Sequence, residues 1–324
     1  MGSDSHTIGL HARIRLTHGV LQRLADDCGA DLLHVKGPAV HEDLLARQDE
    51  DGKSVVVPRV STDADVLVRP AHLDRFLATL EANGWRRLAN FREGSPFGHA
   101  SNYWHDLLGH VDVHRRFPGI EMDAEQAFDR MWADRLDVDL AHTRCATPSV
   151  LAQRLVLLLH AARSGSTDHP DIVRLWTEAD EQTRARTSDL AVEFDAEVGL
   201  AAATGRLEHY RDARTYDLWR QFSTGDTSRL HEWRARIRAA GTPWEAISVA
   251  LQSLTLNRPH LEMDLGHPLT RADIVRGYLH RTQLAARELR SAITARIPRR
   301  AHTPPDNAGT EGHDPARRRD EEAR

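Results

Sequence analysis

The feature that most constrains this chain is a pair of aspartates inside a segment that otherwise has the composition of a buried β-strand. The segment is RVSTDADVLV, residues 59–68, and the two acids are Asp63 and Asp65. Because side chains two residues apart in a strand point to the same face, these carboxylates lie about 6.6 Å apart along the strand. At an effective dielectric constant of about 20 they repel each other by roughly 2–3 kcal/mol, and burial adds a desolvation cost. The fold therefore needs a cation beside this strand, either a divalent metal ion or a basic side chain.

A purely structural interpretation of the pair is that Asp63 caps a turn and Asp65 forms an ion pair with an arginine, for example Arg59. A second acidic strand favours a metal site instead. In HVDVHRR, residues 110–116, Asp112 and His114 alternate with valines, so both side chains share one face of a strand. A third carboxylate from another part of the same sheet would complete a ligand set that suits Mg²⁺.

Upstream of these strands, HVKGPAV places Lys36 and Gly37 at a predicted strand-to-helix turn. A glycine allows close approach of the backbone, and the N-terminus of a helix favours an anion such as phosphate. Carboxylates beside a phosphate site are the usual surroundings of a magnesium ion that is bound together with a nucleotide.

The order of predicted elements indicates an α+β fold, with a small mixed β-sheet domain followed by an all-helical domain. Predicted strands cover 31–37, 59–68, 85–91, 99–107, 110–117 and 137–147, and predicted helices cover 11–28, 38–48, 71–84 and 124–135, with a loop at 49–58. From Pro148 onward the periodicity is helical almost throughout. We therefore predict domains at 1–147 and 148–297. A tail at 298–324, rich in Pro, Gly and charge, is predicted to be disordered.

Taken together and in order, several of these motifs resemble the uncharacterised nucleotidyltransferase-like family of the DNA polymerase β superfold. The motifs are VKGPAV, RVSTDADVLVRP, the helix ending in ANGW, FGHASNYWHD and VDVHRRF. Further on, LLLHAARSG followed by DIVRLW is similar to the helical region of that family. The resemblance covers about residues 15–185.

The resemblance implies transfer of a nucleoside monophosphate from an NTP, by default ATP, to a hydroxyl or similar acceptor, with release of pyrophosphate. Asp63 and Asp65 would bind two Mg²⁺ ions that contact the triphosphate. Asp112 would bind the second ion and help to deprotonate the acceptor. The acceptor itself is not specified, and a small molecule or modified peptide is the expectation.

The resemblance also assigns residues around the acids. Lys36 and Arg59 would contact the triphosphate, and Gly37 would allow its close approach. His114 would orient Asp112 or the acceptor. The chain departs from better-known members of the superfold by having Pro38 after Gly37, where a serine is usual, and proline removes one backbone donor.

Two other functions stay open. The chain could keep the fold but lack transfer activity and serve as a binding or accessory protein for a peptide, an RNA or a partner enzyme, or it could be a metal-dependent phosphohydrolase. Convergence of the three acids supports catalysis, whereas occupation of the site by Arg59 supports a binding protein. Four histidines, 99, 105, 110 and 114, suggest zinc, but their spacing matches no common zinc motif.

The composition argues against several other classes of protein. The formal net charge of -5 gives no support for broad binding to nucleic acid or to an anionic membrane. No apolar stretch is long enough for a membrane span, and the N-terminal residues do not have the pattern of a signal peptide. The two cysteines, Cys28 and Cys145, are expected to be reduced thiols. We therefore predict a cytoplasmic protein.

Overall fold

The computed structural model describes residues 8–283 apart from 49–50, 52, 92–96, 225–228, 253–260, 263–264, 266, 268 and 281. The tail that the sequence predicts to be disordered, 298–324, lies outside these residues.

The centre of the molecule is a mixed five-stranded sheet in the order β1-β4-β7-β6-β5. Its strands are β1 (Leu32–Val35), β4 (Asp63–Val68), β5 (Arg86–Ala89), β6 (Ala100–His105) and β7 (Gly109–His114). Only β4 and β7 run parallel, and the other neighbours are antiparallel. This arrangement confirms the predicted α+β class and the three consecutive strands before residue 115.

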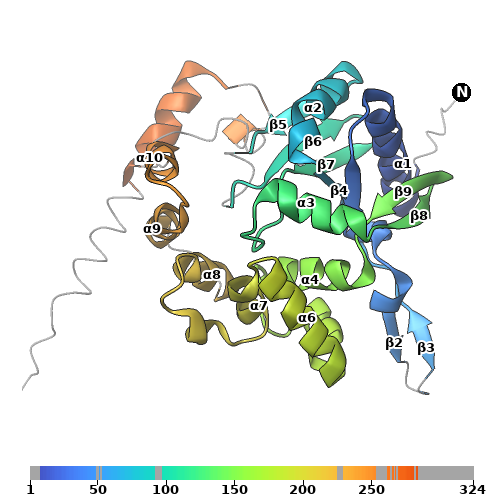
Figure 1. Cartoon of the computed structure of the whole chain (residues 1–324). Helices are drawn as coiled ribbons and strands as arrows, with labels where there is room; N and C mark the ends of the chain where they lie inside the picture. Colours follow the sequence, from blue (N-terminus) through green and yellow to red (C-terminus); the bar gives the residue numbers. More distant parts are fainter. Residues whose placement is uncertain are drawn as a thin grey trace, which may run out of the picture.

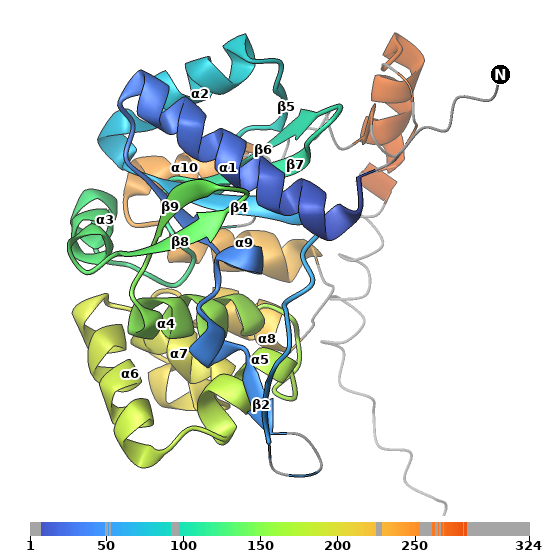
Figure 2. The same cartoon turned by 90° about the vertical axis from the view of Figure 1, so that its right-hand side faces the viewer.

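The two faces of the sheet pack against different helices. Ala64, Val66 and Val68 of β4 join a core with α1 (Leu10–Cys28) and α2 (Leu73–Ala82). Leu67, on the opposite face, joins the core that contains α4 (Val150–Ala161). In Figures 1 and 2, α1 and α4 lie on opposite sides of the sheet. Because side chains alternate along a strand, Asp63 and Asp65 project to the side of α4.

Beyond Thr147 all regular structure of the described residues is helical. The elements are α4, α5 (Pro170–Ile172), a π-helical turn (Val173–Thr177), α6 (Glu181–Glu193), α7 (Glu197–Ala203), a 3₁₀ turn (Leu207–Tyr210), α8 (Tyr216–Ser223), α9 (Arg229–Ala239) and α10 (Pro243–Gln252). Residues 271–280 are also helical. Helix α4, VLAQRLVLLLHA, is apolar on most of its circumference because it lies between the sheet and the helices α6 and α7. Ser149 caps its N-terminus by accepting a hydrogen bond from the backbone N–H of Ala152, as expected from the sequence. The predicted domain boundary at residue 148 stays a prediction.

No described helix combines the length and the apolar character that crossing a bilayer requires.

Two elements predicted from the sequence differ from the structure. Residues 38–48, predicted as a helix, form two short 3₁₀ turns (Gly37–Ala39 and Glu42–Leu44) and then strand β2 (Ala46–Gln48), which pairs with β3 (Ser54–Val56). Strand pairing accounts for the end of this segment, because residues 46–48 pair with β3 in an antiparallel register and cannot also be helical.

Residues 137–147, predicted as one strand, form a separate hairpin of β8 (Leu136–Leu140) and β9 (Thr143–Thr147). The two turn residues, Ala141 and His142, both have positive φ angles, 54° and 60°. Such tight hairpin turns usually contain Asn-Gly or Asp-Gly. The sequence offered no such signal, so the turn was not predicted.

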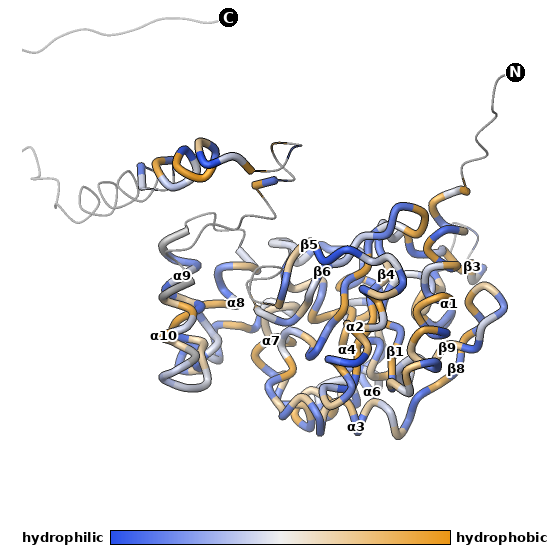
Figure 3. The backbone as a smooth tube through the Cα atoms, turned by 90° about the horizontal axis from the view of Figure 1, so that it is seen from above, coloured by the Kyte–Doolittle hydropathy of each residue, from blue (hydrophilic) through white to orange (hydrophobic). Residues whose placement is uncertain are grey.

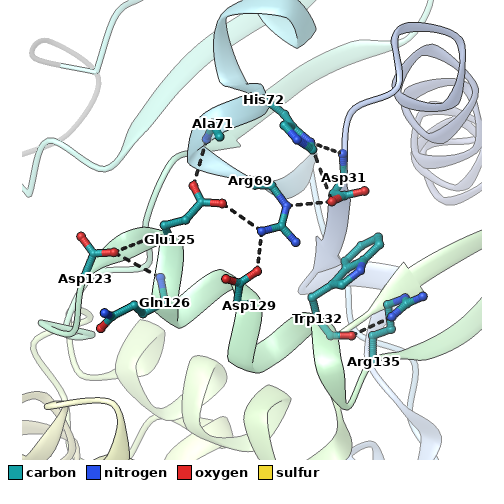
Figure 4. A network of polar contacts seen from close by, with 10 residues as sticks. All are labelled: Asp31, Arg69, Ala71, His72, Asp123, Glu125, Gln126, Asp129, Trp132 and Arg135. Carbon is teal, nitrogen blue, oxygen red and sulfur yellow. Dashed lines mark hydrogen bonds and ion pairs between the residues drawn. The ribbon is translucent and has the colours of Figure 1, made fainter.

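An ion-pair network joins α3 (Ala124–Ala133) to the end of the sheet remote from the acids. Arg69, which directly follows β4, donates from Nε to Asp31 at 2.7 Å and from Nη1 to Glu125 at 2.9 Å. It also pairs with Asp129 (Figure 4). Its guanidinium lies over the ring of Phe128. This network holds the connection after β4 against α3.

Candidate active site

The site begins at the turn after β1, where the backbone adopts two consecutive positive φ angles. Lys36 has a φ of 62° and Gly37 a φ of 49°. A Cβ atom added to Gly37 would lie 3.2 Å from Cβ of Ser61, so only glycine fits without displacing its neighbour. A positive φ at a lysine costs of order 1–3 kcal/mol and persists only where the surrounding structure holds it. Here it directs the lysine side chain onto the sheet.

Asp65 is the centre of the site. The parallel register of β4 and β7 pairs Asp65 with Asp112, and the register of β1 and β4 pairs Val35 with Asp65. One carboxylate oxygen of Asp65, Oδ1, lies 2.5 Å from Nζ of Lys36 and 2.8 Å from Nε2 of His114. The side chains of Asp65 and Lys36 are only 4% and 9% exposed, so this is a buried ion pair.

Two carboxylates beside Asp65 lack a comparable partner. Burial raises the pKa of Asp112, and the negative charge of Asp65 raises it further. Burial and Asp65 also raise the pKa of Asp63, although Lys36 and a hydrogen bond from Ser61 act against this. By contrast, Asp65 is held well below its usual pKa, because Lys36 and His114 outweigh the effect of burial. The site therefore carries negative charge in excess of its own cations.

The structure brings Asp65, Asp112 and His114 together. Each offers one ligand atom, and these atoms lie within 4.8 Å of one another. Asp63 lies on the same face of the sheet, two residues before Asp65 on β4, but it does not belong to this compact group. The Asp112 carboxylate accepts a hydrogen bond from Nδ2 of Asn102, its partner on β6. Three adjacent strands thus contribute polar side chains to one surface.

His114 contacts a different aspartate from the predicted one. The sequence interpretation placed it beside Asp112 or the acceptor, whereas its Nε2 lies against Asp65. Its Nδ1 atom is buried and has no hydrogen-bond partner among the described residues. The ring of His99 packs on that of His114, with the ring centroids 5.1 Å apart.

Arg59 does not lie on the acids. Its Nη1 atom is 3.0 Å from Asp171 of α5, an aspartate that Arg174 also contacts at 2.6 Å. The alternative in which Arg59 pairs with the carboxylates is therefore not found, and Lys36 takes that position instead. Arg59 connects the segment before β4 to the helical region.

Helix α4 adds two residues that the sequence interpretation did not assign to the site. Nη2 of Arg163, just beyond the helix, lies 2.9 Å from Nδ1 of His160. Burial lowers the pKa of His160 to about 2, and Lys36 contributes in the same direction. The buried guanidinium of Arg163 interacts electrostatically with Asp65 and Asp112. The only signal in the sequence was the motif LLLHAARSG, whose polar residues follow an apolar run.

The four histidines considered for zinc do not form one site. His105 packs on Trp85 and His110 packs on Trp104, with ring centroids 5.1 and 4.5 Å apart. The one group of three or more potential metal ligands in the described part of the chain contains two carboxylates and His114.

The donor set fits a hard divalent cation. Oδ1 of Asp65 is taken by Lys36 and His114, which leaves its second oxygen, together with Asp63 and Asp112, as oxygen donors. Oxygen ligands at a partly open site suit Mg²⁺, which keeps several positions for water and phosphate. Burial and then the negative charge of Asp65 raise the pKa values of Asp63 and Asp112, and a cation there would offset that charge.

A comparison with family models identifies the family to which this chain belongs. The model of a family described as uncharacterised nucleotidyltransferase matches residues 24–210. A crystal structure of an antigenic nucleotidyltransferase-like protein from Paracoccidioides brasiliensis is similar at 16% sequence identity and a TM-score of 0.33. That similarity covers 59% of this chain and 93% of the other. No curated protein matches the sequence.

Proposed function

We propose that this chain, which belongs to the uncharacterised nucleotidyltransferase family, transfers a nucleoside monophosphate from an NTP to an acceptor hydroxyl. In this reaction the acceptor oxygen forms a bond to the α-phosphorus. The bond from that phosphorus to the β-phosphate bridging oxygen breaks, and pyrophosphate leaves. The proposal assigns Asp63, Asp65 and Asp112 to metal binding, and ATP is the first nucleotide to test.

The observation that carries the proposal is the pairing of Asp65 with Asp112 on adjacent parallel strands, with Asp63 on the same face. Three carboxylates gathered on a largely buried surface repel one another, and such an arrangement is typical of a site that binds a cation. A turn or a helix cap needs one carboxylate, and neither requires three of them on one surface.

The proposal gives several residues of the site a role in this reaction. Asp112, whose pKa is raised by burial and by Asp65, is suited to take the proton of the acceptor hydroxyl. The proposal assigns contacts with the phosphates to Lys36 and to the backbone of Gly37. His114 positions Asp65 through its hydrogen bond of 2.8 Å. Bound Mg²⁺ would supply neutralisation of the charge on the phosphate oxygens.

Arg163 is a further candidate for contact with the triphosphate. It lies near Asp65 and Asp112 and is buried enough for its pKa to be lowered. A guanidinium in such surroundings binds phosphate oxygens more strongly than one in bulk water. Arg59, which the resemblance assigned to this role, holds Asp171 and would act by fixing the helical region beside the site.

The direct test is nucleotide binding by the whole chain. Thermal unfolding is measured with each of the four NTPs, with and without Mg²⁺, for wild type, Asp63→Asn and the surface control Asp27→Asn. Binding of Mn²⁺ alone, followed by electron paramagnetic resonance, reports the metal site without any nucleotide. We expect Mg²⁺-dependent stabilisation by an NTP in wild type and in the control, and its loss in Asp63→Asn. No shift with any NTP at millimolar concentration would contradict the proposal.

One observation favours a second candidate, a protein that keeps the fold for binding without transfer. Nζ of Lys36 lies 2.5 Å from Asp65, and a lysine in that position supplies positive charge without a metal. A protein of this kind would bind neither Mn²⁺ nor a Mg²⁺-dependent nucleotide. Lys36→Met distinguishes the two candidates. In a transferase the variant should bind the NTP more weakly than wild type does. In a partner-binding protein neither wild type nor the variant should respond to a nucleotide.

A further inference from the structure

The face of the sheet that carries the acids continues beyond them onto β6 and β5. On β7, His110, Asp112 and His114 alternate with valines, so His110 shares the face of Asp112. The antiparallel register pairs Trp104 of β6 with His110, and the ring centroids of these two residues lie 4.5 Å apart. Figures 1 and 3 show β5 and β6 on the side of β4 that is away from the hairpin of β8 and β9. The acids therefore have a pair of rings beside them on the same surface of the sheet.

The strand register fixes how far this pair of rings lies from the acids. The parallel register pairs Asp63 with His110. Because neighbouring strands lie about 4.8 Å apart, the backbone of Trp104, one strand further, lies about 10 Å from that of Asp63. Asn102, two residues before Trp104 on the same face, donates a hydrogen bond to Asp112. One small molecule can therefore contact both the carboxylates and the ring of Trp104.

The indole ring of Trp104 is held in place through its edge. Its Nε1 atom donates to Oδ1 of Asp106 at 2.8 Å, and Nη2 of Arg86 on β5 donates to the same oxygen at 2.9 Å. An indole has no second hydrogen-bonding atom, so the part of the ring that is left for a ligand is apolar. Trp104 is half-buried and His110 is exposed, so solvent reaches this surface. A ring that is already fixed loses little conformational entropy when a ligand stacks on it.

The side on which an acceptor must lie follows from the course of the proposed reaction. In phosphoryl transfer the attacking and the leaving oxygens are roughly in line, with the phosphorus between them. The proposed function assigns the phosphates to Lys36 and Gly37, which directly follow β1. Pyrophosphate would leave towards β1, so the acceptor oxygen would attack from the opposite side of Asp65. On that side lie Asp112 of β7 and then Trp104 of β6.

We propose that the surface formed by Trp104 and His110 binds an aromatic ring of the acceptor, so that the acceptor is a hydroxylated aromatic small molecule. The inference rests on the proposed function, because it assigns the acceptor of the same site. Aromatic rings pack on an indole in offset or edge-to-face arrangements, and such pairs contribute more than the burial of their area alone. The hydroxyl oxygen of the bound acceptor forms the bond to the α-phosphorus, its proton passes to Asp112, and pyrophosphate leaves.

The test uses the whole chain and two probes that differ in aromaticity. Benzyl alcohol and cyclohexylmethanol have the same skeleton of non-hydrogen atoms and one hydroxyl group each. Their dissociation constants are measured by saturation-transfer difference NMR in the presence of Mg²⁺, for wild type, Trp104→Leu and Trp104→Phe. Trp244→Leu, which removes a tryptophan of α10 that is 80% exposed, is the matched control. Mg²⁺-dependent thermal stabilisation by each NTP is measured on the same samples.

We expect wild type to bind benzyl alcohol more tightly than cyclohexylmethanol. The Kd of benzyl alcohol should rise about fivefold in Trp104→Leu, which corresponds to a loss of about 1 kcal/mol. Trp104→Phe keeps a flat ring and, like the control Trp244→Leu, should stay within about twofold of wild type. Stabilisation by the NTP, which does not involve the acceptor, should match wild type in all three variants. If Trp104→Leu does not fold, His110→Ala removes the exposed ring of the pair and should also weaken the binding of benzyl alcohol.

Several results would overturn the inference. Equal binding of the two probes, or an equal loss in Trp244→Leu, would mean apolar attraction without recognition of an aromatic ring. If Trp104→Leu weakens NTP binding and an NTP displaces benzyl alcohol, the surface holds the base of the nucleotide and the acceptor assignment is wrong.

The two proposals fail in different ways. If an NTP binds in the presence of Mg²⁺ but benzyl alcohol does not bind up to its solubility limit, or binds equally well to Trp104→Leu, only the acceptor assignment fails. If benzyl alcohol binds through Trp104 but no NTP binds, the surface recognises an aromatic ring outside any transfer reaction. In that case the proposed transferase function fails, and the acceptor assignment fails with it.

Discussion

Replacing each strand aspartate with asparagine should have opposite effects on stability, although the two side chains differ by only two positions. Asp65→Asn removes the negative partner of Lys36, whose side chain is 9% exposed, and of His114. Breaking a buried ion pair by removing one partner typically costs about 3–5 kcal/mol, because the remaining charge stays buried without compensation. Asparagine still offers an oxygen acceptor, so we expect the lower end of that range, about 3 kcal/mol.

Asp63→Asn should instead leave the metal-free protein as stable as wild type or more stable. It removes the repulsion between Asp63 and Asp65, roughly 2–3 kcal/mol at 6.6 Å and an effective dielectric constant of about 20. It also removes the attraction to Lys36 and weakens the hydrogen bond from Ser61, worth about 1 kcal/mol. The net expectation is a gain of about 0–2 kcal/mol.

Urea unfolding at pH 7.5 with EDTA, followed by circular dichroism, measures both values in the absence of metal. The exposed Asp27→Asn is the matched control and should change the free energy of unfolding by less than about 0.5 kcal/mol. The double variant Lys36→Met/Asp65→Asn should recover part of the loss, since it leaves no uncompensated charge. If Asp63→Asn is destabilised as much as Asp65→Asn, the carboxylates do not repel in the metal-free state and the electrostatic argument is wrong.

Three further predictions concern stability and can be measured by urea unfolding. Burial lowers the pKa of His18 in the folded protein to about 4, so the unfolded state takes up a proton at a higher pH than the folded state does. The free energy of unfolding should therefore fall by about 3 kcal/mol as the pH drops from 6.5 to 4. The variant His18→Gln should lose less stability over the same range. Arg69→Ala, which removes the network in Figure 4, should cost about 1–2 kcal/mol, and no change would mean that its ion pairs are fully solvated. Gly119→Ala places a Cβ 2.7 Å from Trp219 at a φ of 92° and should cost at least about 2 kcal/mol. Gly205→Ala, with a φ of 71° and no atom within 4 Å, should cost only about 1 kcal/mol for the backbone conformation, and equal losses would exclude the steric cause.

Most strands and helices were predictable because their signals are local. The alternation of VDVH placed Asp112 and His114 on one face, and the run ADVLV placed the acids of β4 opposite a buried apolar face. Helix α2 ends at Asn83-Gly84 and Ser149 begins α4, as their capping residues indicate. The hairpin of β8 and β9 escaped prediction because its turn residues, Ala141 and His142, are not the usual ones at positive φ.

The candidate site was predictable in its residue types but not in its contacts. Periodicity within one strand says which side chains share a face, and it says nothing of which strand lies alongside. The pairing of Asp65 with Asp112 depends on a parallel register between segments 47 positions apart, which the packing of both sheet faces determines.

By itself, then, the sequence determined that two acids share a largely buried strand face and that a cation must accompany them, because repulsion and desolvation follow from spacing and burial alone. Only the tertiary structure decided which basic side chain of the protein forms an ion pair with Asp65. Lys36, through a turn with positive φ, reaches it, while Arg59 turns to Asp171. Charges that lie far apart in the sequence interact only at distances that the folded chain sets.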